Sequence, residues 1–170
     1  RDMIVNGSLP KMDMMRNVPL GFDATTELQM VSYMIIITYK IANMFGVYNV
    51  NFAAALMPVL LFLLTIIVFF LFVREIFNSE DKKSRIKANI IALISTFFMI
   101  TIPSFLSRTV AGIPEKESVA FFFMFASFYL ILKAWKSKKT INYIIFSVLS
   151  GIATALMGLT WGAVTYIYVT

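Results

Sequence analysis

The chain has 170 residues, of which 59% are hydrophobic and 14% are charged, with a net charge of +6. Its mean hydropathy is +0.82, a value that excludes an ordinary soluble domain and predicts a membrane protein. The sequence contains no Cys and no His, which excludes disulfides, thiolate nucleophiles, imidazole bases and zinc sites built from these residues. Any chemistry must therefore use carboxylates, Lys, Arg, hydroxyl groups or a bound hard cation.

Residues 1–27 form a polar segment with several turn-forming residues, among them Gly7, Pro10, Pro19 and Gly21. We expect this segment to be a loop on the outer side of the membrane. The glycosylation sequon at residues 6–8 agrees with that side.

Residues 28–45 are apolar apart from a narrow polar stripe. At about 100° per residue, the stripe contains Gln29, Ser32, Lys40 and Asn43. This pattern predicts an amphipathic helix that lies in the outer membrane interface. The alternative is a membrane-spanning helix, which would place residues 1–27 on the cytoplasmic side.

The rest of the chain, residues 46–170, contains apolar runs long enough to span a membrane. A hydrocarbon core about 30 Å thick requires roughly 20 residues of helix. The final apolar run is too long for one span, so we expect it to fold back near Gly158 and Gly162. The expected spans are 52–73, 88–107, 114–135, 141–157 and an incomplete 161–170. The sequence thus predicts an all-α, polytopic transmembrane bundle, which we interpret as a fragment of a longer chain.

Nine basic residues collect in two connections between these spans, and they predict the orientation. The connections are residues 74–87, with Arg74, Lys82, Lys83, Arg85 and Lys87, and residues 133–139, with Lys133, Lys136, Lys138 and Lys139. Short basic loops stay in the cytoplasm, so residues 108–117 and 158–162 are expected outside. We assign the nine charges to topology and anionic lipid contact, and not to nucleic-acid binding, because no aromatic residues interleave them on a soluble face.

The external connection of residues 108–117, which we call the acidic loop, contains the strongest candidates for chemistry. Arg108 begins it, Gly112 is free to form its turn, and Glu115 and Glu117 follow Pro114, whose fixed φ suits a first helical position. One interpretation is structural: the acids complement the helix dipole and Arg108 pairs with one of them. The other is that both carboxylates bind a hard divalent cation such as Mg²⁺ or Mn²⁺, completed by oxygen ligands from elsewhere.

Trp161 lies beside the second external turn. It fits an aromatic belt at the membrane interface, or one wall of a groove for a lipid chain.

Three stretches of the sequence resemble one family, the catalytic subunits of oligosaccharyltransferases in their archaeal form. Residues 1–21 resemble its first external loop, just after its first acidic motif. Ser-Arg-Thr-Val-Ala-Gly at residues 107–112, followed by Glu-Lys-Glu at 115–117, resembles its second acidic motif. Trp-Gly at residues 161–162 resembles the turn between its fifth and sixth helices.

The resemblance implies a membrane domain like that of GT-C glycosyltransferases. It implies an enzyme that transfers an oligosaccharide from a polyprenyl carrier, dolichol-linked in archaea, to Asn of Asn-x-Ser/Thr in translocated proteins, with Mg²⁺ or Mn²⁺. By the same resemblance Glu115 and Glu117 are metal ligands, Glu117 and Arg108 are catalytic, and Arg108 and Trp161 contact substrate. The family often has Asp where Glu115 stands, and the longer Glu side chain moves the carboxylate by about one methylene. We expect a multi-pass protein of the cell membrane with an extracellular acidic loop, inactive as an isolated fragment because its other ligands lie outside these residues.

Two other functions fit the sequence. One is a non-catalytic transporter in which Arg108 and the two Glu residues gate an ion or lipid pathway. The other is a scaffold whose amphipathic helix at residues 28–45 docks a partner.

Overall fold

The fold was taken from a computed structural model, which describes residues 7, 11–14, 17–24, 27–46, 48–79 and 81–169. Four helices in this part of the chain are long and apolar enough to cross a membrane. They are α3 (Val50–Phe77), α4 (Lys82–Thr101), α6 (Lys116–Trp135) and α7 (Thr140–Gly158). The prediction of an all-α, polytopic membrane fold is confirmed.

The described part of the N-terminal segment contains a small two-stranded ribbon that the sequence pattern did not predict. Strand β1 (Met12–Asp13) pairs antiparallel with β2 (Phe22–Asp23). Between the strands, Asn17 and Gly21 adopt positive φ angles of 53° and 75°. Most of the predicted sequon, at residues 6 and 8, lies outside the described residues.

Helix α2 (Met30–Met44) occupies most of the predicted segment 28–45. Its 15 residues are about 22 Å long, which is shorter than the hydrocarbon core. Met30, Thr38 and Ala42 are buried against the bundle, whereas Tyr33 and Ile37 are exposed. The exposed Lys40 lies beside these residues, so the outward face combines apolar and charged groups. Such a face suits the boundary between lipid and water, and we retain the interfacial placement as a proposal.

Helix α3 begins where Asn49 caps it, with the Asn49 side chain accepting hydrogen bonds from the backbone N–H groups of Asn51 (2.9 Å) and Phe52 (3.4 Å). Its 28 residues contain the predicted span 52–73 and extend beyond it at both ends. A helix of about 42 Å exceeds the hydrocarbon core and is expected to tilt in the bilayer.

The predicted span 88–107 is wrong in its bounds, because the structure divides this region into two helices. Helix α4 starts earlier, where Asp81 accepts a hydrogen bond from the Ser84 N–H (3.4 Å). It ends at Thr101, and the short helix α5 (Pro103–Ser107) follows. Pro103 lacks an N–H and disfavours helical geometry at the preceding residue, and Ile102 accordingly adopts φ −68° and ψ 119°.

The start of the next helix also differs from its prediction. Helix α6 begins at Lys116 with Glu115 as its N-cap residue, so Pro114 is not its first helical position. Its start therefore lies two residues after the expected start at 114.

The reversal after α7 occurs at the predicted place, but glycine geometry does not cause it. The Thr160 and Trp161 N–H groups both bond the Met157 carbonyl, at 2.9 and 2.8 Å. The residues with positive φ in the described part of the chain do not include Gly158 or Gly162. After this turn a 3₁₀ helix, η2 (Gly162–Val164), leads into α8 (Thr165–Val169).

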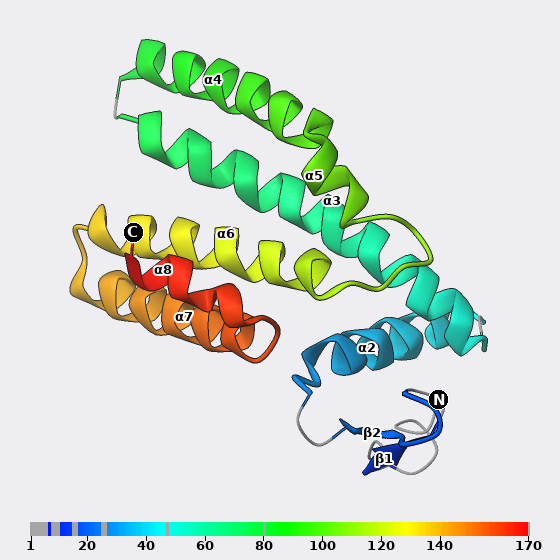
Figure 1. The fold of residues 1–170 in the computed structure, drawn as a ribbon. Coiled ribbons are helices and arrows are strands. Elements are labelled where there is room, and N and C mark those ends of the chain that lie inside the picture. The colour runs from blue at the N-terminus through cyan, green and yellow to red at the C-terminus, as the bar shows by residue number, and fades with distance from the viewer. Residues whose placement is uncertain are drawn as a thin grey trace.

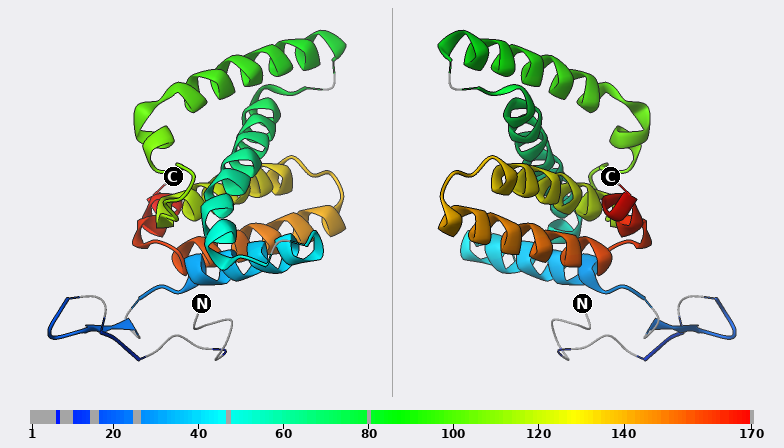
Figure 2. Two further views of the ribbon diagram at one scale, coloured as in Figure 1. Left: turned by 90° about the vertical axis from the view of Figure 1, so that its right-hand side faces the viewer. Right: turned by 90° about the vertical axis from the view of Figure 1, so that its left-hand side faces the viewer.

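The helices form a bundle in which α3 packs between α4 and α6, and α7 packs on the other side of α6 (Figure 1). The two basic connections lie at one end of this bundle, and the acidic loop and the turn after α7 lie at the other. Two further views show α4 diverging from α6 and α7 (Figure 2). The arrangement agrees with the predicted grouping of loops, since antiparallel helices alternate their ends.

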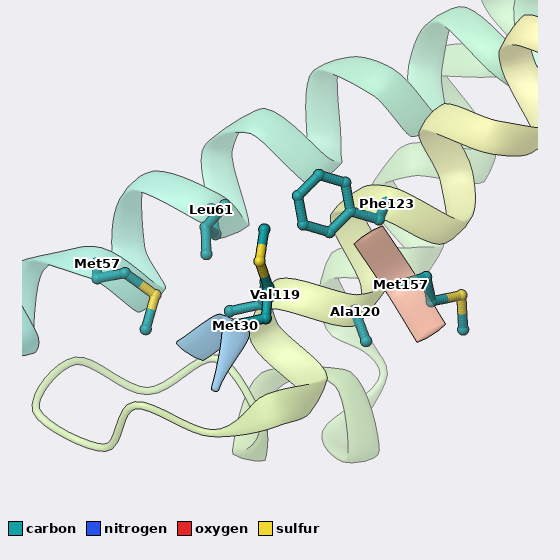
Figure 3. Close-up of a cluster of buried hydrophobic side chains, with 7 residues drawn as sticks. All are labelled: Met30, Met57, Leu61, Val119, Ala120, Phe123 and Met157. Carbon is teal, nitrogen blue, oxygen red and sulfur yellow. The ribbon is translucent and has the colours of Figure 1, made fainter. Parts of the chain in front are cut away.

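A buried apolar cluster joins four of the helices near the end that contains the acidic loop (Figure 3). Its members are Met30 of α2, Met57 and Leu61 of α3, Val119, Ala120 and Phe123 of α6, and Met157 of α7. Farther along α6 and α7 the contact is polar, because the Ser127 hydroxyl lies 2.7 Å from that of Thr154 and 3.2 Å from that of Ser150. Hydroxyl contacts of this kind stabilise helix pairs in membranes. The core therefore holds the start of α6, and with it the acidic loop, in a fixed place.

Candidate functional site

Hydrogen bonds fix the acidic loop at its start and in its middle. Thr109 is buried, and its hydroxyl donates to the carbonyls of Phe105 (3.0 Å) and Leu106 (3.2 Å) at the end of α5. Gly112, with φ +87°, donates its N–H to the Ala55 carbonyl of α3 (3.2 Å). A left-handed conformation is strained for residues other than glycine, so Gly112 explains how the loop turns at this point.

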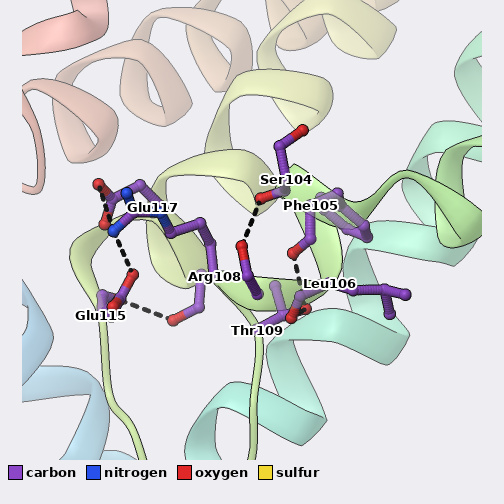
Figure 4. Close-up of polar contacts among 9 residues, drawn as sticks. Ser104, Phe105, Leu106, Arg108, Thr109, Glu115 and Glu117 are labelled. Atoms are coloured by element: carbon purple, nitrogen blue, oxygen red, sulfur yellow. Dashed lines mark hydrogen bonds and ion pairs between the residues drawn. The ribbon is translucent and has the colours of Figure 1, made fainter.

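Both acids of the loop face Arg108 (Figure 4). The Arg108 Nη1 atom lies 3.0 Å from Glu115 Oε2 and 4.0 Å from Glu117 Oε1. Their side chains remain partly exposed, at 51% for Arg108, 29% for Glu115 and 21% for Glu117. One guanidinium thus joins two carboxylates that belong to the start of α6.

The two acids raise the pKa of Arg108 above its ordinary value. The hydrogen bond from Arg108 to Glu115 is the main cause, followed by the charges of Glu115 and Glu117. The guanidinium therefore stays protonated at every physiological pH, and the site keeps a fixed positive charge between its two acids.

The structural interpretation placed both acids in the first turn of the helix, and α6 has only Glu117 there. Glu115 is the N-cap residue, yet its side chain makes no capping hydrogen bond. The cap is supported differently: the buried Ser118 hydroxyl donates to the Glu115 backbone carbonyl at 2.7 Å. Glu117 does lie in the first turn, where it complements the helix dipole. The pairing with Arg108 that this interpretation expected is present, and it includes both acids.

A cavity of about 400 Å³ opens beside this cluster, and we call it the aromatic cavity. It is lined by Met99, Ile102, Ser104, Phe105, Arg108, Glu117, Phe121, Phe125 and Trp161. Trp161 meets Phe121 edge-on, with ring centroids 6.3 Å apart. Three of the four predicted site residues, Arg108, Glu117 and Trp161, therefore line one cavity, while Glu115 joins it through Arg108.

The sequence analysis did not predict the three Phe residues that line this cavity. Phe121 and Phe125 are one helical turn apart and so share a face of α6, a spacing that was available to read. Phe105 reaches the cavity only because Pro103 redirects the chain into α5, which hydropathy alone does not reveal. Apart from that spacing, nothing in the sequence distinguishes these three Phe residues from the lipid-facing ones.

The carboxylates of the acidic loop meet part of what a divalent cation requires. Among the described residues no group of three or more His, Cys, Asp or Glu side chains comes together. Glu115 and Glu117 supply carboxylate oxygen of the kind that Mg²⁺ and Mn²⁺ prefer, but two carboxylates do not fill an octahedral shell. The two carboxylates thus have the chemistry that a hard cation prefers, and alone they would not complete its coordination.

Fold and site together define a polytopic membrane protein with an arginine–carboxylate cluster at the mouth of an aromatic cavity. The family model described as "Oligosaccharyl transferase STT3, N-terminal" matches residues 12–170. The chain belongs to this oligosaccharyltransferase family and forms part of the membrane domain of a glycosyltransferase, whose donor is a lipid-linked oligosaccharide and whose acceptor is a protein. The comparisons with curated proteins and with solved structures found no match.

Proposed function

We propose that the chain is the N-terminal part of a catalytic oligosaccharyltransferase subunit of the archaeal type, and that the acidic loop belongs to its active site. One observation carries this proposal: Arg108, Glu117 and Trp161 line a single cavity, and Glu115 is bonded to Arg108. Trp161 follows α7 and is far in sequence from the acidic loop that contains the other three residues, so their convergence is a property of the fold.

The cavity has the two chemical characters that a lipid-linked oligosaccharide donor requires. Its aromatic and aliphatic lining, which includes Phe121, Phe125 and Trp161, suits a polyprenyl chain such as dolichol. Arg108 at its mouth presents a planar guanidinium that suits the phosphate groups of the carrier. We assign substrate contact to Arg108 and Trp161 on this basis.

Glu115 and Glu117 would hold the divalent cation, Mg²⁺ or Mn²⁺, together with ligands from other parts of the full-length protein. When bound, the cation would neutralise negative charge that develops on the departing phosphate. The protein's own groups prepare the site: Arg108 keeps the two carboxylates close to each other although both are negatively charged. Glu117, which also lines the cavity, is our candidate for contact with the acceptor Asn of an Asn-x-Ser/Thr sequence on the extracellular side.

The proposal is tested by Glu115→Gln and Glu117→Gln in the full-length protein. We expect each variant to lower glycan transfer to an acceptor peptide by at least about tenfold, because a ligand to a charge-stabilising cation is lost. Raising the Mn²⁺ concentration should restore part of the activity, since weaker metal affinity is overcome by mass action. The matched control is Lys116→Gln, an exposed charge between the two acids, which should leave transfer unchanged.

Other outcomes of the same experiment would identify the alternatives. Unchanged transfer in both Gln variants would exclude a ligand role for the acids. Altered ion or lipid flux without dependence on added divalent ion would indicate a transporter. If the chain is a scaffold, these substitutions would leave partner binding unchanged, whereas a charge at the exposed Ile37 of α2 would weaken it.

A further inference from the structure

Helix α3 contains a proline in its interior, and this residue, Pro58, is fully buried. Proline has no N–H, so it cannot donate to the carbonyl of Ala54, four residues earlier in the helix. Its ring also pushes that carbonyl aside, which bends the helix and loosens the turn before the proline. The carbonyl groups of this turn are therefore able to accept hydrogen bonds from outside α3.

The acidic loop bonds this loosened turn through its backbone. The Gly112 N–H donates to the carbonyl of Ala55, the residue after Ala54, at 3.2 Å. In the part of the chain that the structure describes, this is the one backbone hydrogen bond between the loop and α3. Membrane helices tolerate an interior proline because neighbouring segments bond the loosened backbone, and here that segment is the acidic loop.

Packing fixes this part of α3 against the start of α6. Met57 and Leu61, on either side of Pro58, are buried in the same apolar cluster as Val119 of α6 (Figure 3). Because the cluster holds α3 at these residues, the bend at Pro58 determines where the preceding Ala55 carbonyl lies relative to α6. The acids of the loop are at the start of α6, so the bend also determines how the loop approaches them.

We propose that Pro58 is a positioning residue of the candidate active site. By opening α3 it makes the Ala55 carbonyl available to Gly112, and this bond sets the place of Arg108 before it and of Glu115 after it. The effect of Pro58 on the loop is a property of the fold. Its effect on glycan transfer rests on the proposed function of the acidic loop.

The test is Pro58→Ala in the full-length protein, because alanine supplies the N–H that proline lacks. This N–H should bond the Ala54 carbonyl, straighten α3 and draw the Ala55 carbonyl away from Gly112. Hydrogen–deuterium exchange is measured by mass spectrometry on peptides of residues 108–115. We expect it to become about tenfold faster, as when one backbone hydrogen bond is lost.

Glycan transfer should respond through turnover and not through donor binding. We expect kcat to fall about tenfold, because small displacements of catalytic groups slow a reaction strongly. KM for the donor should change by less than about threefold, since the aromatic lining that suits the polyprenyl chain is unaltered. A loss of packing alone would lower the amount of folded protein and leave the kcat of the folded fraction unchanged.

The matched control is Leu60→Ala, which changes an exposed residue of α3 close to Pro58 and leaves the backbone N–H groups as they are. It should leave both the exchange of the loop and glycan transfer unchanged. Pro58→Val repeats the test with a larger side chain, so that a cavity left by alanine does not determine the result. It also replaces Pro58→Ala if that variant does not fold.

The outcomes separate the possible causes. Unchanged exchange at residues 108–115 in both Pro58 variants would overturn the proposal. Equal acceleration in Leu60→Ala, or faster exchange along all of α3 with unchanged kcat, would also overturn it and indicate a packing role. Faster exchange confined to the loop with unchanged kcat would support the positioning role of Pro58 and contradict the proposed function of the loop.

Discussion

Arg108 reconciles the two interpretations of the acidic loop that the sequence left open. A purely structural pairing would need one carboxylate, and the guanidinium here reaches both Glu115 and Glu117. Ion pairs between exposed groups contribute little to stability, because water screens them and the long side chains lose freedom when they pair. The arrangement is therefore better explained by the need to hold two carboxylates together at the mouth of the aromatic cavity.

Substitution of Arg108 tests that explanation at the scale of a single residue. Arg108→Gln removes the charge between the carboxylates and is expected to lower glycan transfer by about tenfold to a hundredfold. Arg108→Lys keeps the charge but lacks the planar fork, so it should recover only part of the activity. Initial rates at saturating and limiting donor would measure both effects. A lysine variant as active as the wild type would exclude a specific role for guanidinium geometry.

The charged residues of the site and Trp161 were predictable, whereas the Phe residues of its lining were not. Charges are rare in an apolar chain, so Arg108, Glu115 and Glu117 stand out by type and spacing alone. Glu115 follows Arg108 by seven positions in the sequence. The hydrogen bond between their side chains depends on the φ angle of Gly112 and on the residue at which α6 begins. Contacts of this kind require the tertiary structure.

At the scale of the elements, Gly112 couples the acidic loop to α3. An added Cβ at this position would meet no atom within 4 Å, so the strain of Gly112→Ala would come from its φ of +87° alone. We expect this variant to lose about 1–2 kcal/mol of loop stability and part of the transfer activity. The matched control is Gly151→Ala, in open space within α7, which should be neutral or slightly stabilising. Thermal unfolding and glycan-transfer rates should be measured for both variants. Equal effects of the two substitutions would contradict this role for Gly112.

The helices illustrate what hydropathy does and does not predict. Apolar length located α3, α6 and α7 because spanning a bilayer fixes the number of residues needed. Apolar length gave the wrong bounds for α4. The Asp81 cap determines the start of this helix and Pro103 determines its end, and both are local backbone effects. The small ribbon of β1 and β2 was missed because strands of two residues leave no periodic pattern.

At the scale of the whole molecule, the bundle separates two chemistries between its ends. The acidic loop and the aromatic cavity occupy one end, and the two basic connections occupy the other. The basic residues orient such a bundle with their end in the cytoplasm, and this rule supports our proposal that the acidic loop is extracellular. A donor carried by a membrane lipid would then reach Arg108 from the side of the bilayer.

The central claim is that Glu115 and Glu117 hold a catalytic divalent cation. It is tested most directly by electron paramagnetic resonance of Mn²⁺ titrated into the full-length protein, with Glu115→Gln, Glu117→Gln and the control Lys116→Gln. We predict one tightly bound Mn²⁺ per chain in the wild type and the control, and affinity lowered at least about tenfold in each Gln variant. Equal Mn²⁺ affinity and stoichiometry in all four proteins would contradict the account.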